Sequence, residues 1–242
     1  MNHSWTPPEP VSREAQAEKI HAILCDHLQT NLLDKSCLEV GCGNGAISYH
    51  LKGKTRQMIG VEINGKALFS SPFLSNGSLR FIQGDGRQLP FADSQFDIII
   101  LAQVYEHMTH QEKLSGEIYR VLKPGGICFF SGPNRWRVVE PHYFLPFLAW
   151  LPRKLASVYL RVTRRGEVYN INPRGYWGLN NLWQDFKIID YTWQIIKFPK
   201  KFSLYGNSLI NRVLRKMPSI IIKKLQPLYA NYNWILVKED DE

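Results

Sequence analysis

Three glycines alternate with other residues in GCGNG, directly after the apolar run CLEV. Gly41, Gly43 and Gly45 carry no Cβ, so the backbone can adopt positive φ angles here and let a ligand lie against it. GCGNGA also fits the pattern G-x-G-x-x-G/A, which leads from a strand into a helix and binds dinucleotides. The spacing therefore predicts a site for a cofactor that contains a nucleoside.

Two acidic residues flank this turn. Glu62 ends the next apolar run, about 20 residues on, where a carboxylate can accept hydrogen bonds from ribose hydroxyls. Glu39 lies two residues before Gly41, and its carboxylate would attract an ammonium or sulfonium group and repel a pyrophosphate. The pattern leaves two interpretations, a nicotinamide or flavin enzyme and a binder of another adenosine cofactor. Glu39 favours the second unless it merely caps a helix or faces water.

These residues need strands that end at one edge of a sheet. Apolar runs predict strands at SCLEV, MIGVEIN, LRFIQGD, FDIIILAQV and GICFFSGP. Helices are predicted at 13–33, from Ala46 to about Gly53 and at about 111–122, where LKPGG ends the last one. Strands that are apolar on both faces and alternate with helices are typical of a doubly wound α/β domain with a parallel sheet.

The C-terminal third predicts one helix and two strands. Asn172 can cap a helix that has Pro173 at its first position and runs to about Phe186. KIIDYTWQIIKF and NYNWILVKE are then expected to form the two final strands.

Four segments, LEVGCGNG, VEIN, GDGRQLPFADSQFDIIILAQVYEH and YRVLKPGG, occur in a characteristic order. Over about residues 20–135 the chain resembles class I S-adenosylmethionine-dependent methyltransferases, in particular the branch with the ubiquinone and menaquinone methyltransferases. The resemblance implies a Rossmann-like, seven-stranded, mostly parallel sheet with an antiparallel last strand. We expect one methyltransferase domain over 1–242, with a cofactor-binding core at about 13–135 and a strand pair with a basic insert at about 172–242. The segment after strand five, about 136–171, is too long for a simple connection and is expected to form a lid.

S-adenosylmethionine is the cofactor that the resemblance implies. Gly41, Gly43 and Gly45 are expected to approach its methionine part, and Glu39 to position its amino group. The carbonyl of Gln103, at the end of the fourth strand, is expected to face the same part.

The resemblance also assigns the adenosine end of the cofactor. Glu62 is expected to hold the ribose hydroxyls, with Ile63 against the adenine ring. Asp85 is expected to accept a hydrogen bond from the adenine amine, and Gly86 to contribute backbone contacts.

Methyl transfer from a sulfonium needs alignment of the reacting atoms, and a base only where the acceptor must lose a proton. His107, in the loop after the fourth strand, is the first candidate for that base. Tyr105 and Glu106 share its loop and can orient an acceptor hydroxyl. His142 and Tyr143, after the fifth strand, are weaker candidates. AQVYEH replaces the Asn/Asp-Pro-Pro-aromatic motif of many nucleobase methyltransferases, which disfavours base methylation.

Basic charge is concentrated in one block of the chain. Residues 151–225 contain 15 Lys and Arg against 3 Asp and Glu, whereas residues 1–150 contain 14 of each. Aromatic residues stand beside these cations in the lid, and aliphatic residues do so at 208–228. The pattern is compatible with a roof over the active site, with an anionic membrane surface contacted through 143–165 and 208–228, or, less favoured, with nucleic acid.

The preferred function is methyl transfer to a small amphipathic or lipid-linked acceptor, such as a glycolipid or polyprenyl-linked sugar hydroxyl. The alternatives are an RNA methyltransferase and a non-catalytic S-adenosylmethionine-binding or interaction protein. No metal site is expected, because the four cysteines lack ligand spacing. The chain has no run of 18 apolar residues and no secretory start, so we expect a cytoplasmic protein, peripheral at the inner membrane face, with frayed residues 1–10.

Overall fold

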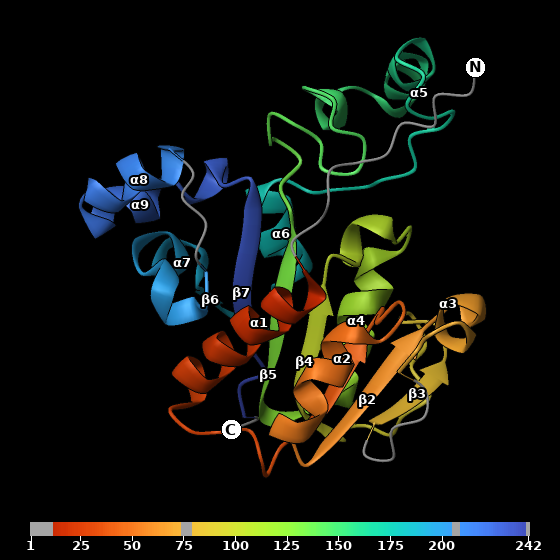
Figure 1. The fold of residues 1–242 in the computed structure, drawn as a ribbon, viewed down its shortest axis with the longest axis vertical. Coiled ribbons are helices and arrows are strands. Elements are labelled where there is room, and N and C mark those ends of the chain that lie inside the picture. Colours follow the sequence, from red (N-terminus) through yellow and green to blue (C-terminus); the bar gives the residue numbers. More distant parts are fainter. Residues whose placement is uncertain (1–11, 74–78, 205–208, 241–242) are drawn as a thin grey trace.

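The computed structural model describes residues 12–73, 79–204 and 209–240 of the 242-residue chain. The residues predicted to fray, 1–10, lie outside the described part. Within it, one sheet of seven strands has the order β3-β2-β1-β4-β5-β7-β6 (Figure 1). The strands are β1 Ser36–Val40, β2 Gln57–Glu62, β3 Leu79–Gln83, β4 Phe96–Ala102, β5 Leu122–Pro133, β6 Lys187–Asp190 and β7 Asn231–Val237.

The pairing of the strands confirms the predicted doubly wound α/β fold. β1 pairs in parallel with β2 and β4, β2 with β3, and β4 with β5. β7 runs antiparallel to both β5 and β6. The parallel strands therefore end together, at the edge where this class of sheet binds its ligands.

Helices cover both faces of the sheet (Figure 1). They are α1 Arg13–Leu28, α2 Ala46–Leu51, α3 Gly65–Phe69, α4 Gln111–Val121, α5 Arg153–Val162, α6 Tyr176–Leu182, α7 Thr192–Lys197, α8 Leu209–Lys216 and α9 Ser219–Lys224. Short 3₁₀ turns are η1 Lys52–Lys54, η2 Tyr105–His107, η3 Leu148–Trp150, η4 Pro199–Phe202 and η5 Gln226–Leu228. Successive β4 residues enter opposite cores: Ile98 packs with α1 and α2, and Ile99 with α4 and α6.

The helix predicted at 13–33 ends five residues early. The Ser12 hydroxyl accepts a hydrogen bond from the amide of Ala15 and caps its start. Gln29 adopts a left-handed conformation, with φ 54°, which stops the helix after Leu28.

The fifth strand begins at the first residue of LKPGG, not after this segment. β5 starts at Leu122, and its ladder with β4 shifts register between Phe96 and Ile98. Gly125 takes φ 68°, and its amide donates to the carbonyl of Lys238 at 2.9 Å. The LKPGG segment thus stays hydrogen-bonded to residue 238. What was predicted as a break between helix and strand is an irregularity within β5.

Only the first four residues of the predicted strand KIIDYTWQIIKF form a strand, and the prediction is wrong for the rest. β6 ends at Asp190, whose Oδ1 accepts from the Thr192 amide at 2.7 Å, and α7 begins there. When an aspartate side chain accepts a hydrogen bond from the backbone amide two residues later, that amide no longer needs a partner in the sheet, and the strand can end there. Thr192 and Ile195 then bury one side of the short helix.

The helix predicted to start at Asn172 and Pro173 starts instead at Tyr176. The backbone amide of Asn172 donates to the Glu106 carbonyl at 2.7 Å, and the backbone carbonyl of Asn172 accepts from Gln111 Nε2 at 2.8 Å. These two bonds tie residue 172 to the loop after β4, so Asn172 does not act as a cap. Gly175 precedes the helix in its place.

The segment predicted to form a lid, residues 136–171, lies at the end of the molecule where the parallel strands finish (Figure 1). It has a small hydrophobic core of its own, formed by Leu145, Leu148, Ala149, Ala156, Leu160, Tyr169 and Ile171. In the part of the chain that the structure describes, no helix is long and apolar enough to cross a bilayer.

Candidate active site

The glycine turn leads from β1 into α2, and the Gly41 amide donates a hydrogen bond to the Val61 carbonyl near the end of β2. Its glycines have φ angles of 72°, 58° and 78°. A Cβ on Gly41 would lie 2.5 Å from Val104 Cγ2, and one on Gly45 would lie 2.1 Å from Phe81, whereas a Cβ on Gly43 would meet nothing within 4 Å. The packing of the protein itself therefore requires Gly41 and Gly45, and Gly43 is the position that faces open space.

Two cavities meet at this turn, and both are lined by Gly41 and Gln103. The larger has a volume of about 450 Å³ and is lined, among the predicted residues, by Glu62, Ile63, Gly86 and His107. The smaller, of about 90 Å³, is lined among them by Glu39 and Gly43. Asp85, Gly45, Tyr105 and His142 line neither cavity.

Glu39 faces the smaller cavity from inside the protein. It is 3% exposed and accepts a hydrogen bond from the Ser48 hydroxyl. Burial raises the pKa of Glu39 to about 7, because the ionised carboxylate is poorly solvated there. A cation in the smaller cavity would stabilise that ionised form. Arg13, which the sequence did not single out, also lines this cavity.

Glu62 is held in place at the larger cavity by two backbone amides. Its Oε2 accepts from Gly43 at 2.9 Å, and its Oε1 accepts from Asn64 at 2.8 Å. A carboxylate has about four acceptor sites, so it can accept further hydrogen bonds while held in this way. Next to it, Ile63 is 56% exposed and offers an apolar surface to a flat ring.

Asp85 pairs with a residue that the sequence did not single out. Arg87 donates to it through Nε at 3.0 Å and through Nη2 at 2.6 Å. This hydrogen bonding lowers the pKa of Asp85. Arg87 lines the larger cavity, whereas Asp85 does not. The adenine contact predicted for Asp85 stays a prediction. The sequence signal that could have indicated Arg87 is its position two residues after an acid that follows a predicted strand.

Gln103 lies between the two cavities and has a φ of 59°. Its amide donates to the Ser131 carbonyl at 2.7 Å. Its side-chain Nε2 donates to Ser131 Oγ at 3.1 Å and to Asn231 Oδ1 at 3.0 Å. Strands β5 and β7 thus hold the turn that leads out of β4, although Asn231 is 128 residues away along the chain.

Tyr105 has a structural role in this fold. The residue is 0% exposed, its hydroxyl donates to the Pro133 carbonyl at 2.5 Å, and it accepts from the Arg174 amide at 3.1 Å. Burial raises the pKa of Tyr105 well above its usual value. The geometry does not support the predicted catalytic role, because both partners of the hydroxyl belong to the protein backbone.

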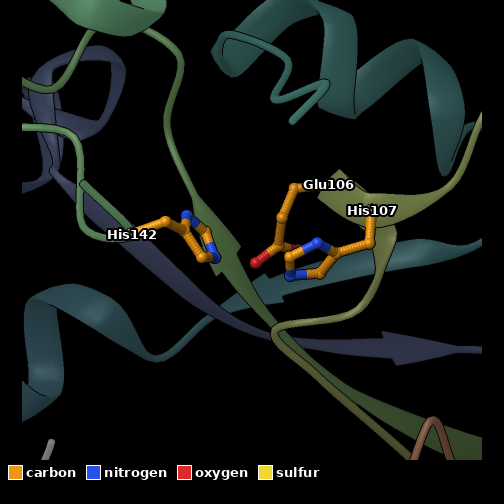
Figure 2. A group of neighbouring side chains, drawn as sticks. All are labelled: Glu106, His107 and His142. Atoms are coloured by element: carbon orange, nitrogen blue, oxygen red, sulfur yellow. The ribbon is translucent and has the colours of Figure 1, made fainter. Parts of the chain in front are cut away.

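The two candidate histidines come together, although they follow different strands. The ring centroids of His107 and His142 are 5.0 Å apart, with the rings nearly perpendicular (Figure 2). His107 is exposed and lines the larger cavity, and its role as a base stays a prediction. Desolvation by the surrounding loops lowers the pKa of His107.

Glu140 holds His142. His142 Nδ1 lies 2.7 Å from Glu140 Oε1, and Glu140 Oε2 accepts from the amides of His142 and Tyr143 at 2.8 Å each. Burial lowers the pKa of His142, but the hydrogen bond to Glu140 and the charge of that carboxylate outweigh it and raise the pKa overall. The sequence did not indicate this role of Glu140.

Comparison with known proteins gives a family match at the same residues. The family described as "Methyltransferase domain" matches residues 38–130. A probable S-adenosylmethionine-dependent methyltransferase of Mycolicibacterium smegmatis is 29% identical over 115 residues, 48% of this chain and 44% of that protein. Demethylmenaquinone methyltransferase of Thermus thermophilus is 33% identical over 134 residues, 48% of this chain and 59% of that protein. The chain thus spans about half the length of these curated relatives.

A solved structure confirms the fold over a longer stretch. The plantazolicin methyltransferase, in complex with a monoazolic desmethylPZN analogue and S-adenosylhomocysteine, has a TM-score of 0.60 at 17% identity. The match covers 94% of this chain and 84% of that one. At this level of identity the likeness speaks for the fold alone.

Proposed function

Since residues 38–130 form a class I S-adenosylmethionine-dependent methyltransferase domain, we propose that the chain transfers the methyl group of this cosubstrate to a small amphipathic acceptor. One observation carries the proposal: two cavities meet at Gln103, with a buried carboxylate facing the smaller and an amide-held carboxylate on the larger. That division suits a molecule with an ammonium group at one end and a ribose at the other.

The residues present fit the two ends of the cosubstrate. Glu39 would hold the amino group, because the open space at Gly43 leads past it. Glu62 would accept from the ribose hydroxyls, and Ile63 would cover the adenine ring. When bound, S-adenosylmethionine supplies an electrophilic methyl group, so the protein mainly has to align the acceptor with it and exclude water. His107 is placed to accept the acceptor's proton where one must leave.

The lid supports the choice of an amphipathic acceptor. On α5, the side chains of Leu155, Val158 and Val162 follow one face and are 56%, 46% and 76% exposed. The opposite face buries Ala156 and Leu160 in the core of the lid. A monomeric soluble protein rarely leaves such a continuous apolar stripe to water, so the stripe favours contact with a lipid.

A second surface of the same kind lies toward the same end of the molecule, on α8 and α9 (Figure 1). Val213 and Ile220 are 59% and 66% exposed there, next to the exposed cations Arg212 and Lys216. The start of this predicted patch, residue 208, lies outside the described residues. We propose that α5 and the α8–α9 surface rest on the anionic cytoplasmic face of a membrane and give the active site access to a lipid-linked acceptor.

One cation of the predicted membrane patch is already used within the lid. Arg165 Nη1 donates to the carbonyls of Tyr143 at 2.7 Å and Phe144 at 2.8 Å. Substitution of Arg165 would therefore disturb the lid itself. Arg153, Lys154 and Arg161 on α5 are exposed and are better placed to meet lipid phosphates.

Transfer of radiolabelled methyl groups from S-adenosylmethionine into host extract tests this function. The extract is separated into lipid, aqueous small-molecule, protein and nucleic-acid fractions, and we expect the label in the lipid fraction. Label confined to RNA would contradict the acceptor class and assign the basic block to nucleic acid. Bound S-adenosylhomocysteine without transfer to any fraction would favour the non-catalytic alternative.

A further inference from the structure

Glu106 is buried without any hydrogen-bond partner for its carboxylate. The residue is 0% exposed, and neither Oε1 nor Oε2 has a partner among the described residues. Buried charged groups are normally paired or bound to a metal ion, because burial otherwise strips them of water without replacement. The methyl-transfer mechanism above gives this side chain no role.

Two imidazoles face this carboxylate. Figure 2 shows the Glu106 carboxylate between the rings of His107 and His142. One carboxylate oxygen and one nitrogen of each ring all lie within 4.8 Å of one another. Ligand atoms around a tetrahedral Zn²⁺, with bonds of about 2.1 Å, are about 3.4 Å apart. Small side-chain rotations would therefore close the three atoms around one ion.

A further carboxylate orients one of the two histidines. The 2.7 Å contact between His142 Nδ1 and Glu140 Oε1 leaves Nε2 as the free nitrogen of this ring. Glu140 is itself 2% exposed and is fixed by the amides of His142 and Tyr143. A histidine that binds a metal through one nitrogen usually gives its other nitrogen to such a carboxylate or to a carbonyl.

We propose that Glu106, His107 and His142 bind one divalent transition-metal ion of the Zn²⁺ type. Two imidazoles and one carboxylate are a ligand set that suits Zn²⁺ and related ions better than Mg²⁺ or Ca²⁺, which prefer oxygen ligands. The positive charge would compensate the buried Glu106 carboxylate. Cysteine spacing could not indicate this site, because its ligands come from the loops after β4 and β5 and include no cysteine.

The proposed ion has a further consequence for the acceptor, which rests on the proposed methyl transfer. Three protein ligands leave at least one coordination position open. His107 lines the larger cavity, so the open position can be reached by an acceptor oxygen from that side. The geometry thus points to an acceptor that carries a hydroxyl close to the methylated atom. With the ion bound, His107 would be a ligand and not the base, and the ion would lower the pKa of that hydroxyl so that its proton can leave to water.

Metal titration of the 242-residue chain, stripped with a chelator, tests the site without any need for activity. Co²⁺ serves as the probe through its visible absorption, and Zn²⁺ is then added to displace it. We expect one equivalent of Co²⁺ to bind in the wild type, and Glu106→Gln to weaken binding at least tenfold. His107→Ala, at an exposed position, is the second variant and is expected to weaken binding similarly without loss of the fold.

His110→Ala is the matched control, because His110 is exposed, lies three residues from His107 and is not among the proposed ligands. Its Co²⁺ affinity is expected to equal that of the wild type. No Co²⁺ binding, or equal binding by the wild type, Glu106→Gln and His107→Ala, would overturn the proposal. S-adenosylhomocysteine binding, measured on the same samples, separates this failure from a failure of the methyltransferase function.

Discussion

The cofactor edge of the sheet and the lid are built in different ways. At the cofactor edge, backbone amides hold Glu62, and strands β5 and β7 hold Gln103, so the side chains are fixed by the sheet itself. The lid holds itself together through a small separate core and leaves an apolar stripe of α5 in contact with water. A site for an unchanging cosubstrate can be rigid, whereas an apolar surface that faces water is completed only by what it contacts.

The largest effect is expected at the glycine turn of the cofactor edge, on the free energy of unfolding. We expect Gly45→Ala to lower the free energy of unfolding by roughly 2–5 kcal/mol, because strain at positive φ adds to the clash with Phe81. Gly43→Ala has space for its Cβ and should cost only about 1–2 kcal/mol. Urea unfolding of both variants measures the difference. Equal losses would show that Phe81 moves aside readily.

Cosubstrate affinity should depend on Glu62 and not on acidic residues elsewhere. Glu62→Ala is expected to weaken S-adenosylhomocysteine binding at least tenfold, about 1.4 kcal/mol, because it removes the acceptor of the ribose hydroxyls and frees the Gly43 amide. Isothermal titration calorimetry provides the measurement. Asp34→Ala, at an exposed acid outside both cavities, is the control, and unchanged affinity in Glu62→Ala would refute the ribose assignment.

The pH dependence of binding should report on Glu39. Its pKa in the folded protein, about 7, exceeds the usual value of 4.5, so this group stabilises the free protein at low pH and that stability is lost as pH rises from 4.5 to 7. Affinity for S-adenosylhomocysteine runs the other way, because the ammonium group needs the ionised carboxylate. We expect affinity to fall by up to about tenfold per pH unit below 7.

Glu39→Gln should remove both pH effects of Glu39, because an amide does not titrate in this range. Calorimetry between pH 5.5 and 8 measures the affinity for S-adenosylhomocysteine, and urea unfolding over about the same range measures the free energy of unfolding. A variant that keeps the wild-type pH profile would assign the titration to another group.

The smallest effects are expected at the lid. Val158→Glu should weaken binding to anionic phosphatidylserine vesicles several-fold, since it places a charge in the apolar stripe of α5. Arg161→Ala should do the same by about 1 kcal/mol, because it removes one unit of positive charge. Cosedimentation with vesicles measures both. Leu33→Glu, at a position that is 60% exposed and far from the lid, is the control, and S-adenosylhomocysteine affinity should not change in any of the three.

The effect of Val158→Glu and Arg161→Ala on vesicle binding also decides between interpretations of the lid. Vesicle binding equal to that of the wild type would contradict the membrane contact and leave the apolar stripe as a surface for another partner.

The sequence alone determined the sheet and the cosubstrate. Apolar runs that alternate with helices predicted the strands β1 to β5, and the glycines and acids at the strand ends predicted a cofactor site at that edge, because these features depend on residues near one another in the chain. Local patterns misplaced the ends of several elements. The predicted strand ends at Asp190 and continues as α7, and Asn172 binds the loop after β4 and does not cap a helix. In both cases a hydrogen bond outweighed local propensity.

Tertiary structure alone decided which loop residues meet. It buried the Tyr105 hydroxyl against backbone groups, placed Arg87 in the cavity instead of Asp85, and brought His142 beside His107 and Glu106. The reason is physical: parallel strands bring their carboxyl ends to one edge of the sheet, so residues from distant loops become neighbours that no short motif can reveal.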